Sequence, residues 1–393
     1  MDNAASNYGH VLLKLNTAGD TAEARSMSDR TFSFIADAPS GDMGVKVVFL
    51  GLVGGYQSSY ATLLAQEQRY AGEQNRNIWE CELDLSPVQT AYLVAHTWEV
   101  LRTHSRYYFM TENCAAGIIE LLNLVVDRPL SPPSKVWVAP IDLFNQLTRE
   151  RAGQPSLVRH ISRVATGAGG PVEPVAQPHE GQRPSMIQTS WRSSSAMGER
   201  WEIRFRPAQN DLLTFAPGAA PGSEVSLFDI RLDYAQNRLS LDTFEVFRAT
   251  NLNAGAPGSA WRRRMGAEQR DLSCLRCLEL FAEGGWGKAA SLGPNAAAYA
   301  YLNGRVDGAN YTGSNLQAGP SAGVLFGSSR TWRASVEGGV WKEMDKAEDS
   351  RTWARVQVRF GASPGWDVRA GLDYQRLSGS DVTESRVSLA RYW

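Results

Sequence analysis

An aromatic run meets a helix-like pattern at Tyr107-Tyr108-Phe109-Met110-Thr111-Glu112-Asn113-Cys114-Ala115-Ala116-Gly117-Ile118-Ile119-Glu120-Leu121-Leu122. From Cys114 onward, small and apolar residues recur at i, i+3, i+4, i+7 and i+8, which is the spacing of one helix face. Asn113 is a good N-cap. We therefore expect Cys114 in the first turn of an amphipathic helix.

Two interpretations of Cys114 stay open on residue chemistry alone. A helix N-terminus carries partial positive charge and unpaired N–H groups, so it stabilises a thiolate and can donate to an oxyanion. This is a useful position for a nucleophilic cysteine. The simpler interpretation is a small buried cysteine that packs the helix against the core.

A second motif is the turn and short apolar strand at Ser6-Asn7-Tyr8-Gly9-His10-Val11-Leu12-Leu13-Lys14-Leu15. By itself, a histidine at a strand end is often only a hydrogen-bonded turn residue. Together with Asn113-Cys114, however, the motif resembles the permuted papain-like superfamily that includes NlpC-type peptidases and lecithin–retinol acyltransferase. The resemblance implies an α+β domain in which His10 is the base for a Cys114 nucleophile.

Residues 1–150 resemble the Lnb-type N-terminal periplasmic domain more closely. The matching pieces follow the order of that family: Gly9-His10, Gly54-Gly55-Tyr56, Arg76-Asn77-Ile78-Trp79-Glu80-Cys81-Glu82-Leu83, Trp98-Glu99, Tyr107-Tyr108-Phe109, Glu112-Asn113-Cys114 and Arg128-Pro129. The resemblance implies a Cys–His site and, for one branch, N-acylation of lipoproteins through a thioester. It does not fix the substrate.

Local patterns add further expectations in this domain. Residues 31–37 and 46–52 are typical of strands. The stretch Gly54–Tyr60 is either a flexible cleft wall or a plain turn. Ser86-Pro87-Val88-Gln89 predicts a helix start with a capping box.

Length, charge and composition set outer limits. The 393 residues suffice for two or three domains, and the net charge of −1 gives no basic field for nucleic acid. No run approaches the ~18 apolar residues of a transmembrane helix. Met1-Asp2-Asn3 leads straight into the Gly9-His10 motif without a signal peptide. We expect a trimmed chain or a shortened gene; a cytoplasmic protein is the alternative.

The pattern changes after a Pro- and Gly-rich stretch at 151–184, which predicts a linker and a domain boundary. From 185 to 393, apolar and charged residues alternate in about 10–12 segments, which is the period of β-strands. Several segments reach the ~10 residues that a membrane strand needs, and the chain ends on an aromatic residue, as outer-membrane barrels do. We favour an antiparallel outer-membrane barrel. A soluble barrel or sandwich would give the same alternation.

The other cysteines favour structure over chemistry. Cys274 and Cys277 form a Cys-x-x-Cys without the second ligand pair that zinc requires, so we predict a local disulfide in an oxidising envelope compartment. Cys81 is expected to pack in a strand. No motif predicts a metal or a cofactor.

The predicted site has incomplete support from the sequence. His10 and Cys114 lie far apart in the chain, so only the fold can bring them together. Asn16, Ser33 and Asp37 are candidates for orienting His10. Tyr108, Glu112 and Asn113 flank the nucleophile and are expected to form the oxyanion and pocket region.

We therefore predict an envelope acyltransferase that faces the periplasm and works through an acyl-Cys114 intermediate on a lipid or lipoprotein substrate. A cysteine peptidase or amidase of cell-wall peptides is the first alternative, and a non-enzymatic envelope scaffold is the second. One departure stands out, because the lipoprotein-acylating branch is expected to anchor with helices whereas this chain continues into strands. Oligomeric state is not predicted.

Overall fold

The computed structural model describes residues 10–16, 30–39, 42, 45–64, 78–130, 137–150, 155–164, 176–219, 222–252, 259–269, 272, 277–308, 315–328, 330–344, 350–377 and 379–393. The chain divides into two compact units, Met1–His179 and Glu180–Trp393. Within the described residues, no helix combines the length and apolar character needed to cross a bilayer.

The N-terminal unit contains a four-stranded antiparallel sheet in the order β1-β2-β3-β5. Its strands are β1 (Leu13–Leu15), β2 (Arg30–Ala36), β3 (Tyr56–Leu64) and β5 (His104–Tyr107). A separate antiparallel pair joins β4 (Ile78–Leu83) to β6 (Val158–Val164). The predicted strand at 31–37 is thus confirmed as β2. The papain-like assignment stays a prediction that rests on the family resemblance.

Helix α5 (Cys114–Asn123) packs directly on strand β2. Phe32 and Ile118 belong to one buried core, with exposed fractions of 0% and 1%. Gly117 permits the close approach, since a Cβ atom there would lie 2.8 Å from Cγ of Phe34. The apolar face predicted from Cys114 onward therefore faces the core, and it holds the first turn of α5 over the sheet.

The capping box predicted at Ser86-Pro87-Val88-Gln89 is confirmed. Helix α4 (Pro87–Val100) begins after Ser86, whose hydroxyl accepts from the Gln89 N–H, while the Gln89 side chain accepts from the Ser86 N–H. Pro87 occupies the first turn, where its missing N–H does not matter. Helix α6 (Pro140–Thr148) follows, and a 3₁₀ turn covers Pro178–Glu180.

The predicted strand at 46–52 is wrong, because these residues form helix α2 (Val45–Val53). Val47, Val48 and Gly51 are buried whereas Lys46, Phe49 and Val53 are exposed, which is helical spacing. A short apolar run does not by itself distinguish a strand from a buried helix. Gly54 ends the helix with φ +72°, and β3 begins at Tyr56. The Gly54–Tyr60 stretch is therefore a turn followed by a strand.

The predicted linker at 151–184 contains regular structure. Residues 158–164 form β6, which pairs with β4 from Ile78↔Val164 to Leu83↔Val158. The Pro- and Gly-rich sequence around β6 conceals a short strand that finds its partner far away in the chain.

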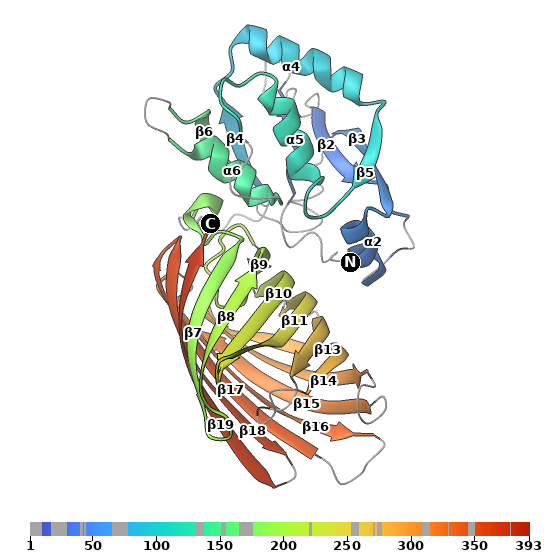
Figure 1. The fold of residues 1–393 in the computed structure, drawn as a ribbon. Coiled ribbons are helices and arrows are strands. Elements are labelled where there is room, and N and C mark those ends of the chain that lie inside the picture. Colours follow the sequence, from blue (N-terminus) through green and yellow to red (C-terminus); the bar gives the residue numbers. More distant parts are fainter. Residues whose placement is uncertain are drawn as a thin grey trace. The chain divides into compact units, whose positions relative to one another are not determined.

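The C-terminal unit is a closed antiparallel barrel of 12 strands. Figure 1 shows these strands curving side by side into the barrel. Strand β10 pairs with both β8 and β11 and so closes the ring, while the short β9 adds to β10. The ring strands are β7 (Met186–Ser194), β8 (Gly198–Arg206), β10 (Ser223–Ala235), β11 (Arg238–Asn251), β12 (Ser259–Gln269), β13 (Leu278–Gly293), β14 (Ala296–Asp307), β15 (Asn315–Phe326), β16 (Trp332–Glu343), β17 (Ser350–Ser363), β18 (Trp366–Leu377) and β19 (Ser380–Tyr392). The extra strand β9 is Ala208–Asn210.

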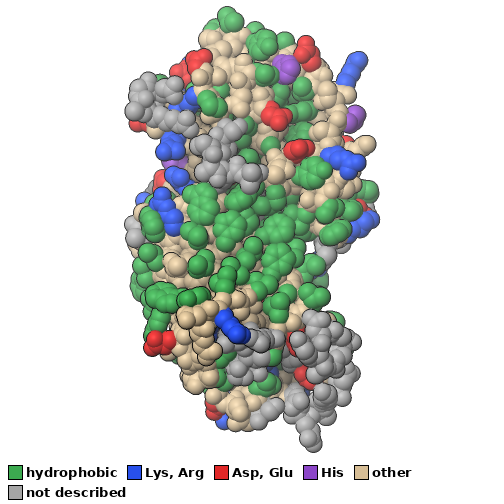
Figure 2. Space-filling model, viewed as in Figure 1, with side chains coloured by type: hydrophobic (Ala, Val, Ile, Leu, Met, Phe, Trp, Pro, Cys, Tyr) green, Lys and Arg blue, Asp and Glu red, His purple; other side chains and the backbone are tan. Residues whose placement is uncertain are grey.

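The barrel carries its charges inside and its apolar residues outside. Glu202, Arg359 and Glu384 point inward and are 0% exposed, whereas Leu302 and Trp286 point outward and are 69% and 61% exposed. Hydrophobic side chains gather on the outer face of the strands in Figure 2. This is the arrangement of an outer-membrane barrel and the inverse of a soluble one. The predicted membrane barrel is confirmed, and the soluble alternative is wrong.

Candidate active site

Asn113 fixes the start of the helix that carries Cys114. Its Oδ1 accepts from the N–H groups of Ala115 (3.0 Å) and Ala116 (3.2 Å). Its amide nitrogen donates to the carbonyl oxygens of Phe109 (2.9 Å) and Val138 (2.6 Å). The predicted N-cap is thus confirmed. Because these bonds use both ends of the amide, Asn113 holds the helix in position, and its role as an oxyanion donor stays a prediction.

The Cys114 sulfur is buried among hydrogen-bond donors. The residue is 4% exposed. The backbone N–H groups of Val11, Ala115 and Cys114 itself and the side chain of Tyr107 act on it as hydrogen-bond donors that lower its pKa. Burial raises the pKa of the Cys114 thiol above its usual value, and these hydrogen bonds oppose that rise only in part. The site therefore combines a desolvated thiol with donors suited to a thiolate.

His10 lies just before β1, and its ring is tied to the neighbouring strand. Nε2 of His10 and Oγ of Ser33, a fully buried residue on β2, are 2.7 Å apart. Asp37 instead accepts from the Ser59 hydroxyl at 2.9 Å, and Asn16 is exposed. Of the three candidates for orienting His10, Ser33 is thus the one seen at hydrogen-bonding distance.

The fold brings the His10–Val11 segment against Cys114, although the two are distant in sequence. The link runs from the Val11 N–H to the Cys114 sulfur, directly next to His10 in the chain. The Cys114 sulfur is thus linked to the Val11 backbone, whereas the His10 imidazole ring is linked to Ser33. Proton transfer between the His10 ring and the sulfur stays a prediction.

Tyr108 and Glu112 shape the turn before the nucleophile. Their backbones exchange two hydrogen bonds of 3.1 Å each. The Tyr108 ring lies over Gly54, where a Cβ atom would be 2.4 Å from Cζ. Glu112 is exposed and Tyr108 is half-buried. Their contact with a substrate stays a prediction.

Three residues that the sequence did not single out belong to the same neighbourhood. Burial, and then the Cys114 charge, raise the pKa of the Tyr107 hydroxyl. The Tyr60 hydroxyl donates to the Gly117 carbonyl at 3.1 Å, and burial followed by the Glu120 charge raises its pKa to about 12. Partial burial raises the pKa of Glu120, and repulsion from Glu112 adds to it. Tyr107 stands in the aromatic run before Cys114, which is the signal that could have found it.

The remaining cysteines have structural surroundings. Cys277 is disulfide-bonded. Cys274 lies outside the described residues, so its pairing with Cys277 stays a prediction. Cys81 is a free, half-buried cysteine, and burial raises the pKa of its thiol to about 12.

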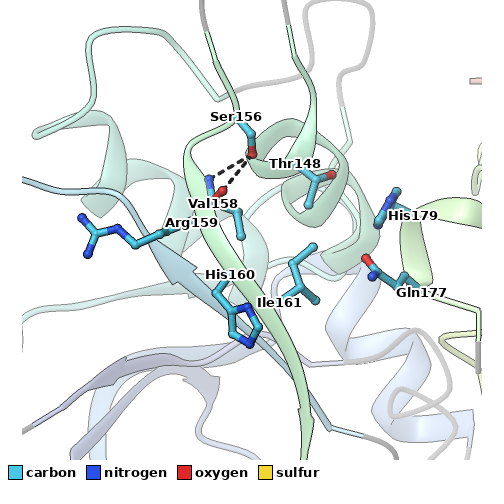
Figure 3. Close-up of a pocket in the computed structure, with 8 residues that line it drawn as sticks. All are labelled: Thr148, Ser156, Val158, Arg159, His160, Ile161, Gln177 and His179. Atoms are coloured by element: carbon cyan, nitrogen blue, oxygen red, sulfur yellow. Dashed lines mark hydrogen bonds between the residues drawn. The ribbon is translucent and has the colours of Figure 1, made fainter. Parts of the chain in front are cut away.

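One pocket of the N-terminal unit lies apart from these residues. It has a volume of about 360 Å³ and is lined by Thr148, Ser156, Val158, Arg159, His160, Ile161, Gln177 and His179. Figure 3 shows His160 and Ile161 on β6, with Gln177 and His179 across from them. The His179 ring stacks on Phe144 at 5.7 Å. In the part of the chain that the structure describes, no three His, Cys, Asp or Glu side chains gather as metal ligands.

These features define the class: an envelope protein with a barrel in the outer membrane and an α+β unit that carries a buried cysteine at a helix start. The chain belongs to the family described as Domain of unknown function (DUF7840), whose family model matches residues 175–392. Residues 1–150 match the family described as the Lnb N-terminal periplasmic domain. The predicted family is confirmed, and the chain is a periplasm-facing protein of the outer membrane.

Comparison with other proteins adds little beyond this. No functionally curated protein is significantly similar to the chain. Among solved structures, the NanC porin is 6% identical with a TM-score of 0.36 and covers 53% of this chain and 99% of its own. The KdgM porin in complex with disordered oligogalacturonate is 10% identical with a TM-score of 0.33 over 53% and 99%. The COG4313 outer membrane channel from Pseudomonas putida F1 is 8% identical with a TM-score of 0.35 over 57% and 100%.

Proposed function

We propose that the N-terminal unit is a cysteine-dependent acyltransferase that acts at the periplasmic face of the outer membrane on a lipid or lipoprotein. The observation that carries this proposal is the set of donors around the Cys114 sulfur. Three backbone N–H groups and the Tyr107 side chain act as donors to one thiol at a helix N-terminus. Such a group stabilises developing negative charge on the sulfur.

In the first half-reaction, the Cys114 thiol gives its proton to His10 and attacks the carbonyl carbon of an ester. In this proposal the His10 imidazole is the base, and Ser33, 2.7 Å from Nε2, orients the ring. The carbon–oxygen bond of the ester breaks, and the leaving alcohol takes the proton from His10. The product is an acyl thioester on Cys114.

In the second half-reaction, an amine attacks the thioester and gives a proton to His10. The carbon–sulfur bond breaks, and the Cys114 thiolate recovers the proton as the amide leaves. With water as the acceptor, the same site would hydrolyse its substrate, which is the peptidase or amidase alternative. The membrane barrel supports the lipid version, because it tethers this unit beside lipid.

One observation favours a different function. Burial of Cys114 raises its pKa, as expected of a structural cysteine in an envelope scaffold. If the protein is an enzyme, its substrate must reach the sulfur of Cys114, a residue that is only 4% exposed. The two candidates therefore differ in whether the thiol reacts at all.

The deciding experiment is labelling of the full-length protein, folded in detergent, with a lipid-tailed 2-bromoacyl electrophile. Mass spectrometry would locate the adduct in wild type, Cys114→Ser and His10→Ala. We expect an adduct on Cys114 in wild type, none on that residue in Cys114→Ser, and labelling slower by about 100-fold in His10→Ala. Cys81→Ser is the matched control and should leave labelling of Cys114 unchanged, because Cys81 lies on β4 in a separate two-stranded sheet.

A peptide-tailed electrophile, tested in parallel, separates the substrate classes. Faster labelling by the lipid-tailed probe supports the acyltransferase, and faster labelling by the peptide supports the peptidase. If neither probe modifies Cys114 while the barrel is shown to be folded, the enzyme proposal is wrong and the scaffold stands.

A further inference from the structure

The connection between β8 and β10 lies at the periplasmic mouth of the barrel. Met186, at the start of the first barrel strand, pairs with both Tyr392 and Arg206. Both ends of the barrel sequence and the end of β8 therefore lie at one mouth. Since the residues before Met186 lead back to the periplasmic domain, this mouth faces the periplasm.

Residues 207–219 of this connection reach across the lumen. Oδ2 of Asp211 accepts hydrogen bonds from Arg206 on β8 (3.1 Å) and Arg369 on β18 (2.7 Å). Leu213 packs in a buried cluster with Tyr299 on β14 and Leu325 on β15. In the ring order, β8 and β18 lie on one arc and β14 and β15 on the opposite one. Asp211 thus fixes the segment to one arc, and Leu213 joins it to a buried cluster that reaches the other, so the segment extends across the lumen at this mouth.

The same carboxylate also holds the segment in its folded shape. Oδ1 of Asp211 accepts from the Leu213 N–H (3.0 Å) and the Thr214 hydroxyl (2.7 Å). Gln182 braces it from the other side. Its N–H donates to the Phe215 carbonyl (2.8 Å), its Oε1 accepts from the Phe215 N–H (2.9 Å), and its Nε2 donates to Asp367 (2.7 Å).

We propose that residues 207–219 are a plug that closes the barrel to ions, and that Asp211 anchors this plug to the barrel strands. The inner face of the barrel near Asp211 is rich in arginine. Arg333, Arg359 and Arg369 are cross-strand neighbours on β16, β17 and β18. Removing the Asp211 charge weakens the plug and leaves these cations with less negative charge. The opened passage is therefore selective for anions.

The test is ion conductance of the full-length chain in planar lipid bilayers. Wild type should show no steady conductance. Asp211→Asn keeps an oxygen that can accept from Leu213 and Thr214 but loses the charge that faces Arg206 and Arg369. We expect open events to be about 100-fold more frequent in this variant, because buried Arg206 and Arg369 each lose one of two anionic partners and keep only Asp229 and Asp367. The reversal potential in a salt gradient should indicate anion preference.

Asp381→Asn is the matched control, because Asp381 is 48% exposed and pairs with the exposed Arg376. It should stay silent. A second variant replaces residues 208–219 with a flexible Gly-Ser segment and should conduct whether or not Asp211→Asn folds. Heat-modifiable migration in gels would confirm folding of each barrel. A conducting wild type overturns the proposal, and so do folded variants that both stay closed. Conductance only in the replaced variant would overturn the role of Asp211.

Discussion

The two units of this chain put their apolar residues on opposite sides. In the N-terminal unit, Phe32 and Ile118 are buried at 0% and 1% exposure. In the barrel, Glu202 and Glu384 are 0% exposed while Leu302 is 69% exposed. The same hydrophobic effect produces both arrangements, because the outside of one unit is water and the outside of the other is lipid.

The comparison also shows how each unit tolerates buried polar groups. Asn113 lies in the N-terminal unit and is satisfied mainly by backbone atoms. The barrel buries whole clusters of ions, in which Arg192 bonds to Glu202, Asp233 and Glu384. A charge can be buried when its partners are buried with it. The barrel interior should therefore depend on complete sets of partners.

The largest expected effect comes from breaking one such set. Glu384 accepts from Arg192 Nε at 2.6 Å and also from Arg200. Glu384→Gln should lower the free energy of unfolding of the barrel by about 3 kcal/mol, because it leaves buried arginines short of negative charge. Urea titration of the full chain in lipid vesicles would measure this.

The control for Glu384 is Asp381→Asn on the same strand. Asp381 pairs with Arg376 at the exposed end of the hairpin, with exposed fractions of 48% and 56%. An exposed pair should be worth about 0.5 kcal/mol. Equal losses from the two substitutions would show that the inner ions do not act as a buried set.

A smaller effect should separate the two outer surfaces. Leu302 on β14 faces outward at mid-strand, so Leu302→Arg should cost about 3 kcal/mol or less, depending on its depth in the bilayer. Tyr92 on α4 is 57% exposed, and Tyr92→Arg should change stability by about 0.5 kcal/mol or less. Unfolding in vesicles and in detergent would measure both. A large loss at Tyr92 would mean that the α4 surface is also covered.

Part of this fold follows from the sequence because local signals and tertiary structure agree. The Ser86-Pro87-Val88-Gln89 capping box predicted α4, and the period-two alternation predicted the barrel strands. The alternation itself could not say which face is inside, since soluble and membrane barrels share it. Helix α2 was predicted as a strand because the apolar run at 46–52 is too short for its hydrophobic periodicity to distinguish a strand from a helix.

The candidate site is predictable only in part, for a related reason. Asn113 and Cys114 sit in one local motif, so their cap geometry follows from the sequence. The approach of Val11 to the sulfur depends on how β1 and α5 pack, which no local pattern encodes. Ser33 was one of three candidates, and only the pairing of β1 with β2 brings it to His10.

The smallest expected effect concerns a carboxylate that, unlike the buried acids of the barrel, is not paired with arginines in the part of the chain that the structure describes. Glu120 on α5 has no cationic partner among the described residues, and partial burial, then Glu112, raise its pKa. A raised pKa means that folding favours the protonated form. This stabilisation is complete below the ordinary carboxyl pKa and is lost as the pH rises through the raised value. At pH 7, Glu120→Gln should therefore stabilise the N-terminal unit, by about 0.3 kcal/mol after allowing for solvent screening. The gain should vanish near pH 4, where Glu120 is itself neutral.

Urea unfolding of this unit in the full chain would measure both values. Glu112→Gln should give a smaller gain of the same sign, because it removes only the repulsion. If Glu120→Gln destabilises the unit at pH 7, then Glu120 has a cationic partner after all, and the contrast with Glu384 fails.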